Sequence, residues 1–250
     1  MNFRDFKDFT KGTFCGTMIT VKKVDWNLKT IAHIRTEYGD KFGIPRQSGM
    51  ETSFPATIIF EPEYRDLNAV KGLEGFSYIW VLWEFSKTEQ TKWSPTVRPP
   101  RLGGNRRMGV FATRSPFRPN PIGLSSLKLE SIELSKTNGP LLHVKGADIL
   151  DMTPIYDIKP YLPFCDSHPD ALSGFAGESQ DYRLNVDFRN NLTDGIDGDV
   201  LSGITEALAL DPRPSYQDDP NRVYKADIAG CSVEFTVQDG TVYVERLIKR

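Results

Sequence analysis

The chain has 250 residues, a formal net charge of −2 and a hydrophobic content of 39%, which is ample for one large domain or for a medium domain with a small one. Its three cysteines (Cys15, Cys165 and Cys231) are far apart and have no metal-ligand spacing, which fits reduced thiols in a cytoplasmic protein. Residues 1–20 hold no signal-peptide core, and the longest apolar run, Tyr78–Trp83, is too short for a bilayer. We therefore expect a soluble protein without a membrane segment.

The first two thirds of the chain are predicted to form short strands. Their segments are rich in β-branched and aromatic residues, and turn residues separate them. One helical turn is possible at 68–73, and Asn138-Gly139 is a strong hairpin signal. The predicted strands are Phe14–Val21, Ala56–Phe60, Ser77–Phe85, Gly109–Thr113, Ile122–Glu133 and Leu141–Leu150. Because long helices do not alternate with these strands, a barrel or a sandwich is favoured over a doubly wound sheet.

After about residue 172 the composition becomes polar, and a second small unit is expected. Val200–Leu210 has helical spacing with Asp199 as a plausible N-cap, and Asp239-Gly240 is a hairpin turn. The strands expected around them are Tyr182–Phe188, Val223–Ile228, Ser232–Val237 and Thr241–Leu247. The predicted organisation is an N-terminal extension at 1–27, a mainly β domain at 28–172 and a small α+β unit at 173–250.

Positive charge is concentrated in one segment. Residues 90–129 carry eight basic residues and no acidic one, so the rest of the chain sums to about −10 (23 basic against 33 acidic residues). Six prolines stiffen the segment, and guanidinium groups on a rigid backbone suit a phosphate or carboxylate site. A solvated basic loop is the alternative, but Phe111, Phe117, Leu102 and Met108 lie between the charges.

The sequence lacks the motifs of several common enzyme classes. None of the three histidines sits in a metal-binding pattern, which speaks against a zinc hydrolase. The glycine motifs of Rossmann and P-loop nucleotide sites and the nucleophile elbow of serine hydrolases are also missing from the sequence.

Three segments look functional. Lys41–Gln47 presents Arg46 and Gln47 behind a rigid proline, although a surface turn is the simple alternative. Residues 99–125 interleave arginines with aromatic rings, as nucleotide-binding segments do.

The third segment, 148–163, contains three aspartates whose spacing matches no standard metal loop. Asp151 is better interpreted as a turn residue whose carboxylate accepts hydrogen bonds. Asp157 could pair with Lys159 or with an arginine of the basic segment. For Asp157, a structural ion pair and a functional role are equally open interpretations.

These three segments closely resemble the tRNA N6-threonylcarbamoyladenosine methyltransferase family, the TrmO type. The resemblance runs from about Leu28 to Phe164 and includes Asp211–Tyr216. It implies a small β-barrel that binds S-adenosylmethionine and transfers its methyl group to N6 of threonylcarbamoyladenosine next to the anticodon of tRNA. It also implies a homodimer, and a cytoplasmic role in tRNA modification.

The resemblance also implies the members of the cofactor pocket. The expected cofactor-binding residues are Pro45, Arg46, Gln47, Tyr78, Ile79, Arg114, Leu124, Asp151, Met152, Thr153 and Pro154. The chain departs from the family pattern at two of them, because family members often have histidine in place of Tyr78 and glycine in place of Met152.

The residues expected to act on the acceptor nucleoside are assigned from the chemistry of methyl transfer and from their position in the motifs. Direct methyl displacement depends on positioning, so no metal is expected. We hypothesise that Asp157 or Tyr216 assists the loss of the N6 proton, and that Arg118 or Arg213 holds the threonyl carboxylate in a two-point pair. Tracking of tRNA phosphates is assigned to Arg98, Arg101, Arg106 and Arg107.

Two other functions stay open at this point. A non-catalytic RNA-binding β-barrel module would account for the basic segment and its aromatic residues, but not for the other two segments. A methyltransferase of the same fold with a different acceptor would use the same cofactor. Binding of S-adenosylmethionine separates the first alternative from an enzyme.

Overall fold

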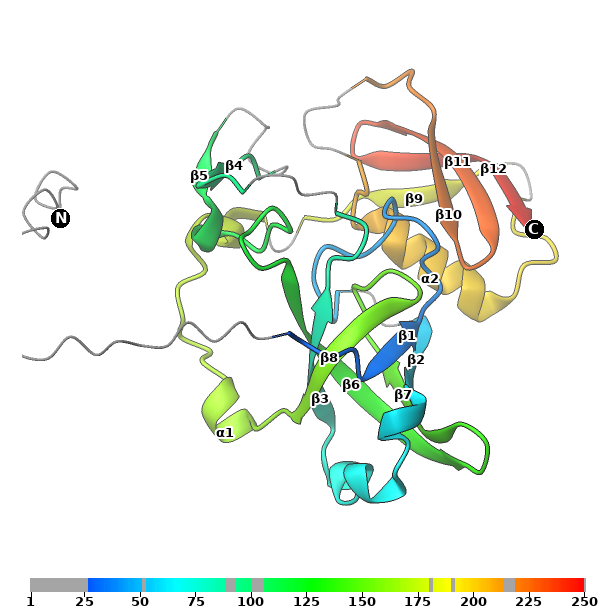
Figure 1. The fold of residues 1–250 in the computed structure, drawn as a ribbon. Helices are drawn as coiled ribbons and strands as arrows, with labels where there is room; N and C mark the ends of the chain where they lie inside the picture. The colour runs from blue at the N-terminus through cyan, green and yellow to red at the C-terminus, as the bar shows by residue number, and fades with distance from the viewer. Residues whose placement is uncertain are drawn as a thin grey trace, which may run out of the picture.

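The protein folds as a closed β-barrel with a smaller α+β unit beside one end of it (Figure 1). The computed structural model describes residues 27–50, 53–88, 93–99, 106–179, 182–189, 192–213 and 219–249. The expected strand Phe14–Val21 lies outside this described part of the chain. The prediction of a mainly β fold with a small barrel and an α+β unit is confirmed.

Six strands close the barrel in the order β1-β2-β7-β6-β3-β8, and every neighbouring pair is antiparallel. Short 3₁₀ helices at Pro62–Tyr64, Leu67–Val70 and Leu73–Gly75 connect β2 to β3. The barrel strands are β1 (Ala32–Arg35), β2 (Pro55–Phe60), β3 (Tyr78–Glu84), β6 (Ile122–Ser135), β7 (Gly139–Lys145) and β8 (Thr153–Pro160).

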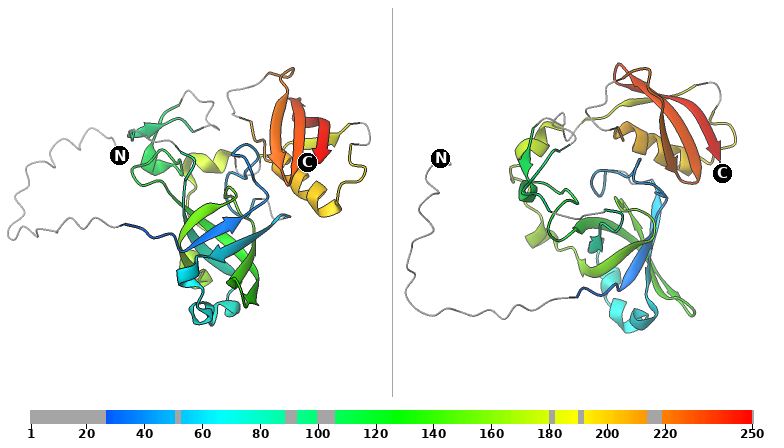
Figure 2. Two further views of the ribbon diagram at one scale, coloured as in Figure 1. Left: turned by 45° about the vertical axis from the view of Figure 1, so that its right-hand side comes forward. Right: turned by 45° about the horizontal axis from the view of Figure 1, so that its top comes forward.

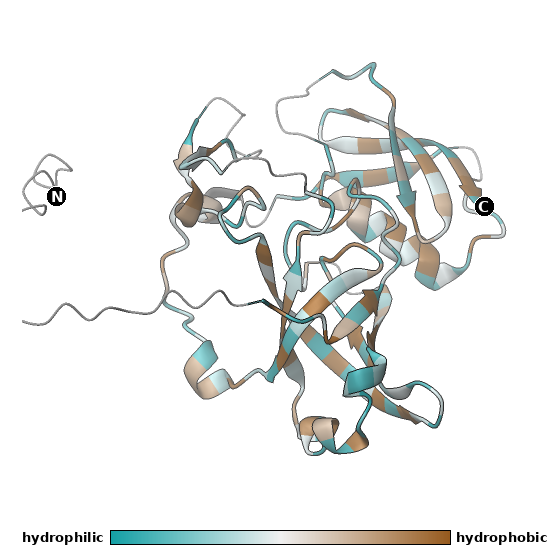
Figure 3. Cartoon of the chain, in the orientation of Figure 1, coloured by the Kyte–Doolittle hydropathy of each residue, from teal (hydrophilic) through white to brown (hydrophobic). Residues whose placement is uncertain are grey.

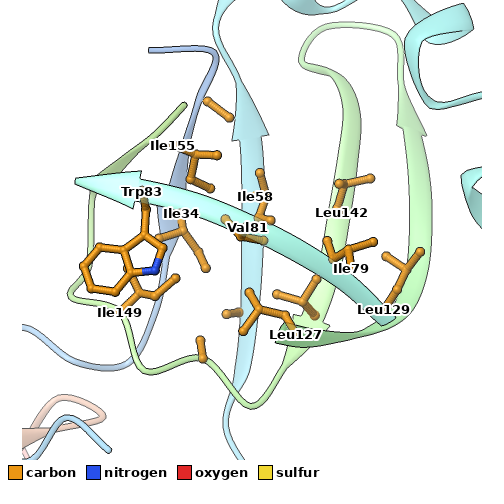
Figure 4. Close-up of a cluster of buried hydrophobic side chains, with 14 of the residues drawn as sticks. Ile34, Ile58, Ile79, Val81, Trp83, Leu127, Leu129, Leu142, Ile149 and Ile155 are labelled. Carbon is orange, nitrogen blue, oxygen red and sulfur yellow. The ribbon is translucent and has the colours of Figure 1, made fainter. Parts of the chain in front are cut away.

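The barrel interior is filled by side chains that alternate along each strand. Every second residue of β3, Ile79, Val81 and Trp83, points inward and is at most 6% exposed. Ile58 of β2 and Leu127 of β6 meet them in the centre (Figure 4). Alternating hydropathy along the barrel strands is visible in Figure 3, and this alternation fixes which face of each strand is inside.

The smaller unit consists of helix α2 (Gly198–Ala209) and a four-stranded sheet in the order β10-β11-β12-β9. Gly240 and Asp239 both have positive φ in the tight turn between β11 and β12, as the sequence predicts. The sheet strands are β9 (Asn185–Phe188), β10 (Tyr224–Ile228), β11 (Cys231–Gln238) and β12 (Thr241–Lys249). Helix α1 (Pro163–Asp166) and a 3₁₀ helix (Gly174–Ser179) lie in the connection between the two units.

The connection between β1 and β2 packs into the core of the smaller unit. Phe42 stacks on Tyr224 and Phe235 at ring-centroid distances of 6.3 and 6.2 Å. Phe54 lies so close to α2 that a Cβ on Gly203 would come within 2.3 Å of its ring. This packing ties the segment before β2 to the C-terminal sheet, while the division of the chain at 172/173 stays a prediction.

Several predicted elements need correction. Gly109–Thr113 is not a strand: the two-residue strand β5 (Met108–Gly109) pairs with β4 (Thr96–Val97), and a 3₁₀ turn at Val110–Ala112 follows. The return strand ends at Lys145 because Gly146 has a φ of +78°. Helix α2 is capped by Asp197 in place of Asp199, because the Asp197 carboxylate accepts from the backbone N–H of Asp199 at 3.0 Å.

Candidate active site

A large open cleft of about 2440 Å³ lies at the end of the barrel where β3 finishes and β6 begins. The β4–β5 ribbon and the C-terminal sheet stand at this end of the barrel, on either side of it (Figure 2). The cleft is lined mainly by segments that are distant in sequence: 41–50 between β1 and β2, 83–88, 94–99, 111–124 and the segment after β7 that includes Asp148. Arg107, residues 173–176 and Arg183 also contribute to its lining. The cleft is the place where the three segments singled out from the sequence converge.

The cleft is strongly basic. Its described lining holds eight basic side chains and two acidic ones, Glu84 and Asp148. A concave wall with this imbalance attracts anions, because the surrounding protein focuses the field of the charges. The basic lining residues are Lys41, Arg46, Lys87, Arg98, Arg107, Arg114, Arg118 and Arg183.

Apolar and aromatic side chains share this wall. Phe111, Phe117 and Leu124 line the cleft and remain 73%, 52% and 54% exposed. Exposed apolar side chains gathered in one cleft, unlike single ones scattered over a surface, are typical of a binding site. Flat rings among arginines suit the stacking of nucleotide bases.

Arg46 links the cleft to the C-terminal unit. Its Nη2 atom donates to the backbone carbonyls of Asp211 and Arg213, both at 2.9 Å. The next residue, Gln47, accepts a hydrogen bond from Nη1 of Arg114 through its amide oxygen. The loop before β2 thus holds Arg114 on one side and the segment 211–213 on the other.

A chain of hydrogen bonds leads from the barrel interior to Asp148. The indole Nε1 of Trp83 donates to Oγ of Ser125 at 2.9 Å, and this hydroxyl donates to Oδ1 of Asp148 at 2.5 Å. Burial raises the pKa of Asp148 to about 6, against the opposing effects of Ser125 and Arg114. The chain depends on Gly123, because a Cβ at that position would lie 2.2 Å from the Trp83 ring.

The second acidic residue of the cleft, Glu84, is held by β8. Its Oε2 atom accepts a hydrogen bond from the hydroxyl of Tyr156 at 2.7 Å. Burial and the neighbouring Glu84 carboxylate raise the pKa of Tyr156 to about 12, so the phenol stays a donor at neutral pH.

Nine residues predicted for the site line the cleft together, and the remaining described ones do not. Arg101 and Tyr216 lie outside the described residues. The nine that the structure brings together are Pro45, Arg46, Gln47, Arg98, Arg107, Arg114, Arg118, Leu124 and Thr153. Those it places elsewhere are Tyr78, Ile79, Arg106, Asp151, Met152, Pro154, Asp157 and Arg213.

Tyr78 and Ile79 lie at the opposite end of β3 from the cleft. The Ile79 side chain is fully buried in the barrel, and Tyr78 packs on Tyr161 with ring centroids 6.2 Å apart. The residues that reach the cleft from this strand are Trp83 and Glu84, followed by Phe85. These residues were not predicted from the sequence. The strand length was the available signal, because a seven-residue strand spans about 20 Å and only one of its ends can border a given site.

Asp151 stabilises the turn that leads into β8, as the sequence predicts. Its Oδ1 accepts from the backbone N–H of Thr36 at 2.9 Å and pairs with Nε of Arg35 at 3.3 Å. The next residue, Met152, has a φ of +61°. This left-handed conformation is the one that glycine adopts without strain, and here a methionine occupies it.

Asp157 and Arg213 both have partners within their own segments. Asp157 accepts from the backbone N–H of Ile158 at 2.9 Å and pairs with Lys159 at 2.8 Å, so the predicted pairing with Lys159 is confirmed. The Arg213 guanidinium forms a two-point pair with Asp211, at 2.8 and 3.1 Å.

No group of three or more His, Cys, Asp or Glu residues in the described ranges has a metal-binding arrangement. No helix in that part of the chain has the length and apolar character needed to cross a membrane.

Comparison with known proteins gives concordant matches over both units. Residues 33–167 match the tRNA-methyltransferase O N-terminal domain and residues 182–250 match the TrmO C-terminal domain. The chain is 39% identical over 226 residues to tRNA (adenine(37)-N6)-methyltransferase of Escherichia coli, covering 86% of this chain and 94% of that protein.

A putative S-adenosylmethionine-dependent methyltransferase of Pseudomonas aeruginosa is 37% identical over 206 residues, which are 79% of this chain and 87% of that protein. The crystal structure of TrmO from the same organism superimposes with a TM-score of 0.74 at 28% identity. That superposition covers 92% of this chain and all of the TrmO chain.

Proposed function

Because the chain belongs to the TrmO family of tRNA methyltransferases, it is an S-adenosylmethionine-dependent enzyme that methylates N6 of adenosine 37 in tRNA, and we propose that its acceptor is threonylcarbamoyladenosine. The observation that carries the proposal is the basic cleft with its exposed aromatic and apolar wall. A threonylcarbamoyl group adds a carboxylate to the base, and the cleft offers arginines for that carboxylate.

The cleft residues fit the methyl donor. S-adenosylmethionine supplies an electrophilic methyl group together with an adenine ring, an ammonium group and a carboxylate. Leu124 and Phe85 offer apolar surface for the adenine ring. Arg114, which Gln47 holds in place, is suited to the carboxylate. Pro45 and Thr153 complete this part of the wall.

Arg118 is the better placed of the two arginines considered for the threonyl carboxylate. It lines the cleft, and its Nη1 donates to the carbonyl of Thr113 at 3.2 Å, which orients the guanidinium. Arg213 is outside the cleft lining and bound to Asp211. We propose that Arg118 binds the acceptor and that Arg213 shapes the segment 211–213, which Arg46 contacts.

We further propose that the enzyme acts as a cytoplasmic homodimer and needs no metal. The exposure of Phe111 and Phe117 supports the binding of a macromolecule over the cleft, either tRNA or another copy of the chain. Direct displacement of a methyl group requires alignment and no Lewis acid. Light scattering after gel filtration gives the oligomeric state, and activity in the presence of a chelator checks the metal.

Nucleoside mass spectrometry tests the acceptor. Purified protein is incubated with S-adenosylmethionine and with two tRNA preparations that differ only in the threonylcarbamoyl group. We expect a gain of one methyl group on threonylcarbamoyladenosine and none on unmodified adenosine. Equal methylation of both preparations would contradict the proposed acceptor, and donor binding without any methylation would indicate a different acceptor.

Salt dependence tests the contacts to tRNA. If Arg98 and Arg107 neutralise phosphates, alanine at either position should reduce the slope of log K against log salt by about 0.7 to 0.9. Arg189→Ala is the matched control, because Arg189 pairs with Glu245 in the C-terminal sheet at 3.0 Å. A slope unchanged in the Arg98 and Arg107 variants, measured by filter binding, would remove these residues from the tRNA interface.

A further inference from the structure

The reaction needs a group that accepts a proton inside the cleft. The N6 nitrogen of threonylcarbamoyladenosine is of urea type, and its lone pair is delocalised until the N–H proton leaves. Glu84 and Asp148 are the two acidic side chains in the described cleft lining. Glu84 already accepts the hydroxyl of Tyr156 at 2.7 Å, which directs it toward β8.

Asp148 is the end of an oriented hydrogen-bond chain. The Ser125 hydroxyl receives the indole N–H of Trp83 and must therefore direct its own hydrogen elsewhere, toward Asp148 at 2.5 Å. Ser125 is fully buried and Trp83 is 6% exposed, so packing locks both side chains. The carboxylate at the end of this chain is held in one position at the cleft surface.

The charges around Asp148 leave it able to act at neutral pH. Burial disfavours its ionised form most strongly, while Ser125, the nearby Arg114 and backbone N–H groups including that of Ser48 favour it. The resulting pKa of about 6 makes Asp148 ionised at pH 7. A carboxylate of this kind accepts a proton more readily than an ordinary aspartate does.

We propose that Asp148 is the catalytic base that takes the N6 proton of the acceptor nucleoside, with Ser125 and Trp83 as its positioning residues. As the new N–C bond forms, the bond from the methyl carbon to sulfur breaks and its electron pair stays on sulfur. The N6–H bond breaks at the same time, and its proton passes to the Asp148 carboxylate, which later releases it to water. This assignment rests on the proposed acceptor, because unmodified adenosine has a different N6 group.

Asp157, the base suggested by motif position, is less suitable. Its carboxylate contacts the Ile158 backbone N–H and the Lys159 ammonium group, and it is outside the cleft lining. Since both aspartates can be changed to asparagine, parallel variants distinguish them directly.

Single-turnover methylation as a function of pH is the first test. With tRNA and donor saturating, the wild-type rate is expected to rise through about pH 6 and then level off, because Asp148 must be deprotonated. Asp148→Asn should lower the plateau rate by about 100- to 10,000-fold and remove this pH dependence. Donor affinity measured by calorimetry should change little, which separates a base from a binding group.

Carboxyl-carbon NMR of the ligand-free protein is the second test, and it needs no activity. We expect one aspartate signal to titrate near pH 6 and to vanish in Asp148→Asn. Ser125→Ala should move that titration to higher pH, because the lost hydroxyl favours the ionised form. The rate profile of Ser125→Ala should move in the same direction.

An active wild-type enzyme whose Asp148→Asn variant keeps its rate and pH profile would overturn the assignment. So would a pH dependence that disappears in Asp157→Asn instead. A wild-type enzyme that binds the donor but methylates no threonylcarbamoyladenosine would overturn the proposed acceptor first and this assignment with it.

Discussion

Alanine at position 123 should lower the methylation rate by about 100-fold and destabilise the barrel. The added Cβ would lie 2.2 to 2.6 Å from three atoms of the Trp83 indole. Trp83 and Gly123 are register partners of β3 and β6, so the hydrogen-bonded strands resist moving apart. Overpacking of this kind costs about 2 to 3 kcal/mol, which corresponds to a melting temperature lower by about 5 to 10 °C.

The activity loss in Gly123→Ala follows from the hydrogen bonds behind the site. A displaced indole no longer fixes Ser125 at 2.9 Å, and Asp148 then loses its orientation. Misplacement by about 1 Å can cost 100-fold in rate. Gly75→Ala is the matched control, because a Cβ there meets nothing within 4 Å. Normal melting and turnover in Gly123→Ala would show that Trp83 can relax, contrary to the packing described above.

Removing the Arg46 side chain should loosen the C-terminal unit from the cleft. Arg46→Ala deletes two hydrogen bonds from a charged donor to the carbonyls of Asp211 and Arg213. Such bonds contribute about 1.5 to 3 kcal/mol each, with incomplete additivity. We expect a melting temperature lower by about 5 to 10 °C and faster amide exchange in 211–213. Arg46→Lys should be intermediate, because an ammonium group cannot reproduce the fork.

Arg107→Ala is the control for the loss of a cleft arginine. Arg107 donates to the hydroxyl of Thr96 at an exposed position, 3.0 Å away, so its removal should leave the melting temperature within about 1 °C. If Arg46→Ala melted like Arg107→Ala, Arg46 would contribute charge to the cleft and no connection between the two units.

The fold could be predicted from the sequence where a strand has a clear pattern of apolar residues or a turn has its characteristic residues. Ser77–Phe85 has the alternation of β3, and Asp239-Gly240 has the chemistry of the tight turn it forms. β8 was missed because Pro154, Asp157 and Lys159 interrupt its apolar pattern, although it closes the barrel by pairing with both β1 and β3. Pairing on both edges stabilises a strand whose own sequence is a weak predictor.

The same distinction holds for the site. Motifs identified Pro45, Gln47 and Arg114, which the fold does bring to one cleft. The motifs could not show which end of β3 faces the cleft, because Tyr78 and Glu84 belong to one continuous strand. Only the closed barrel places these two residues at opposite ends, one of which borders the cleft. The contact of Gly123 with Trp83 likewise exists only after β3 and β6 pair, so a lone glycine in the sequence gives no sign of it.

A crystal structure with S-adenosylhomocysteine tests the location of the active site most directly. We predict that the product binds in the cleft beside Gln47, Arg114 and Leu124, with its sulfur on the side of Asp148. Binding at the other end of β3, beside Tyr78 and Tyr161, would contradict this assignment of the site.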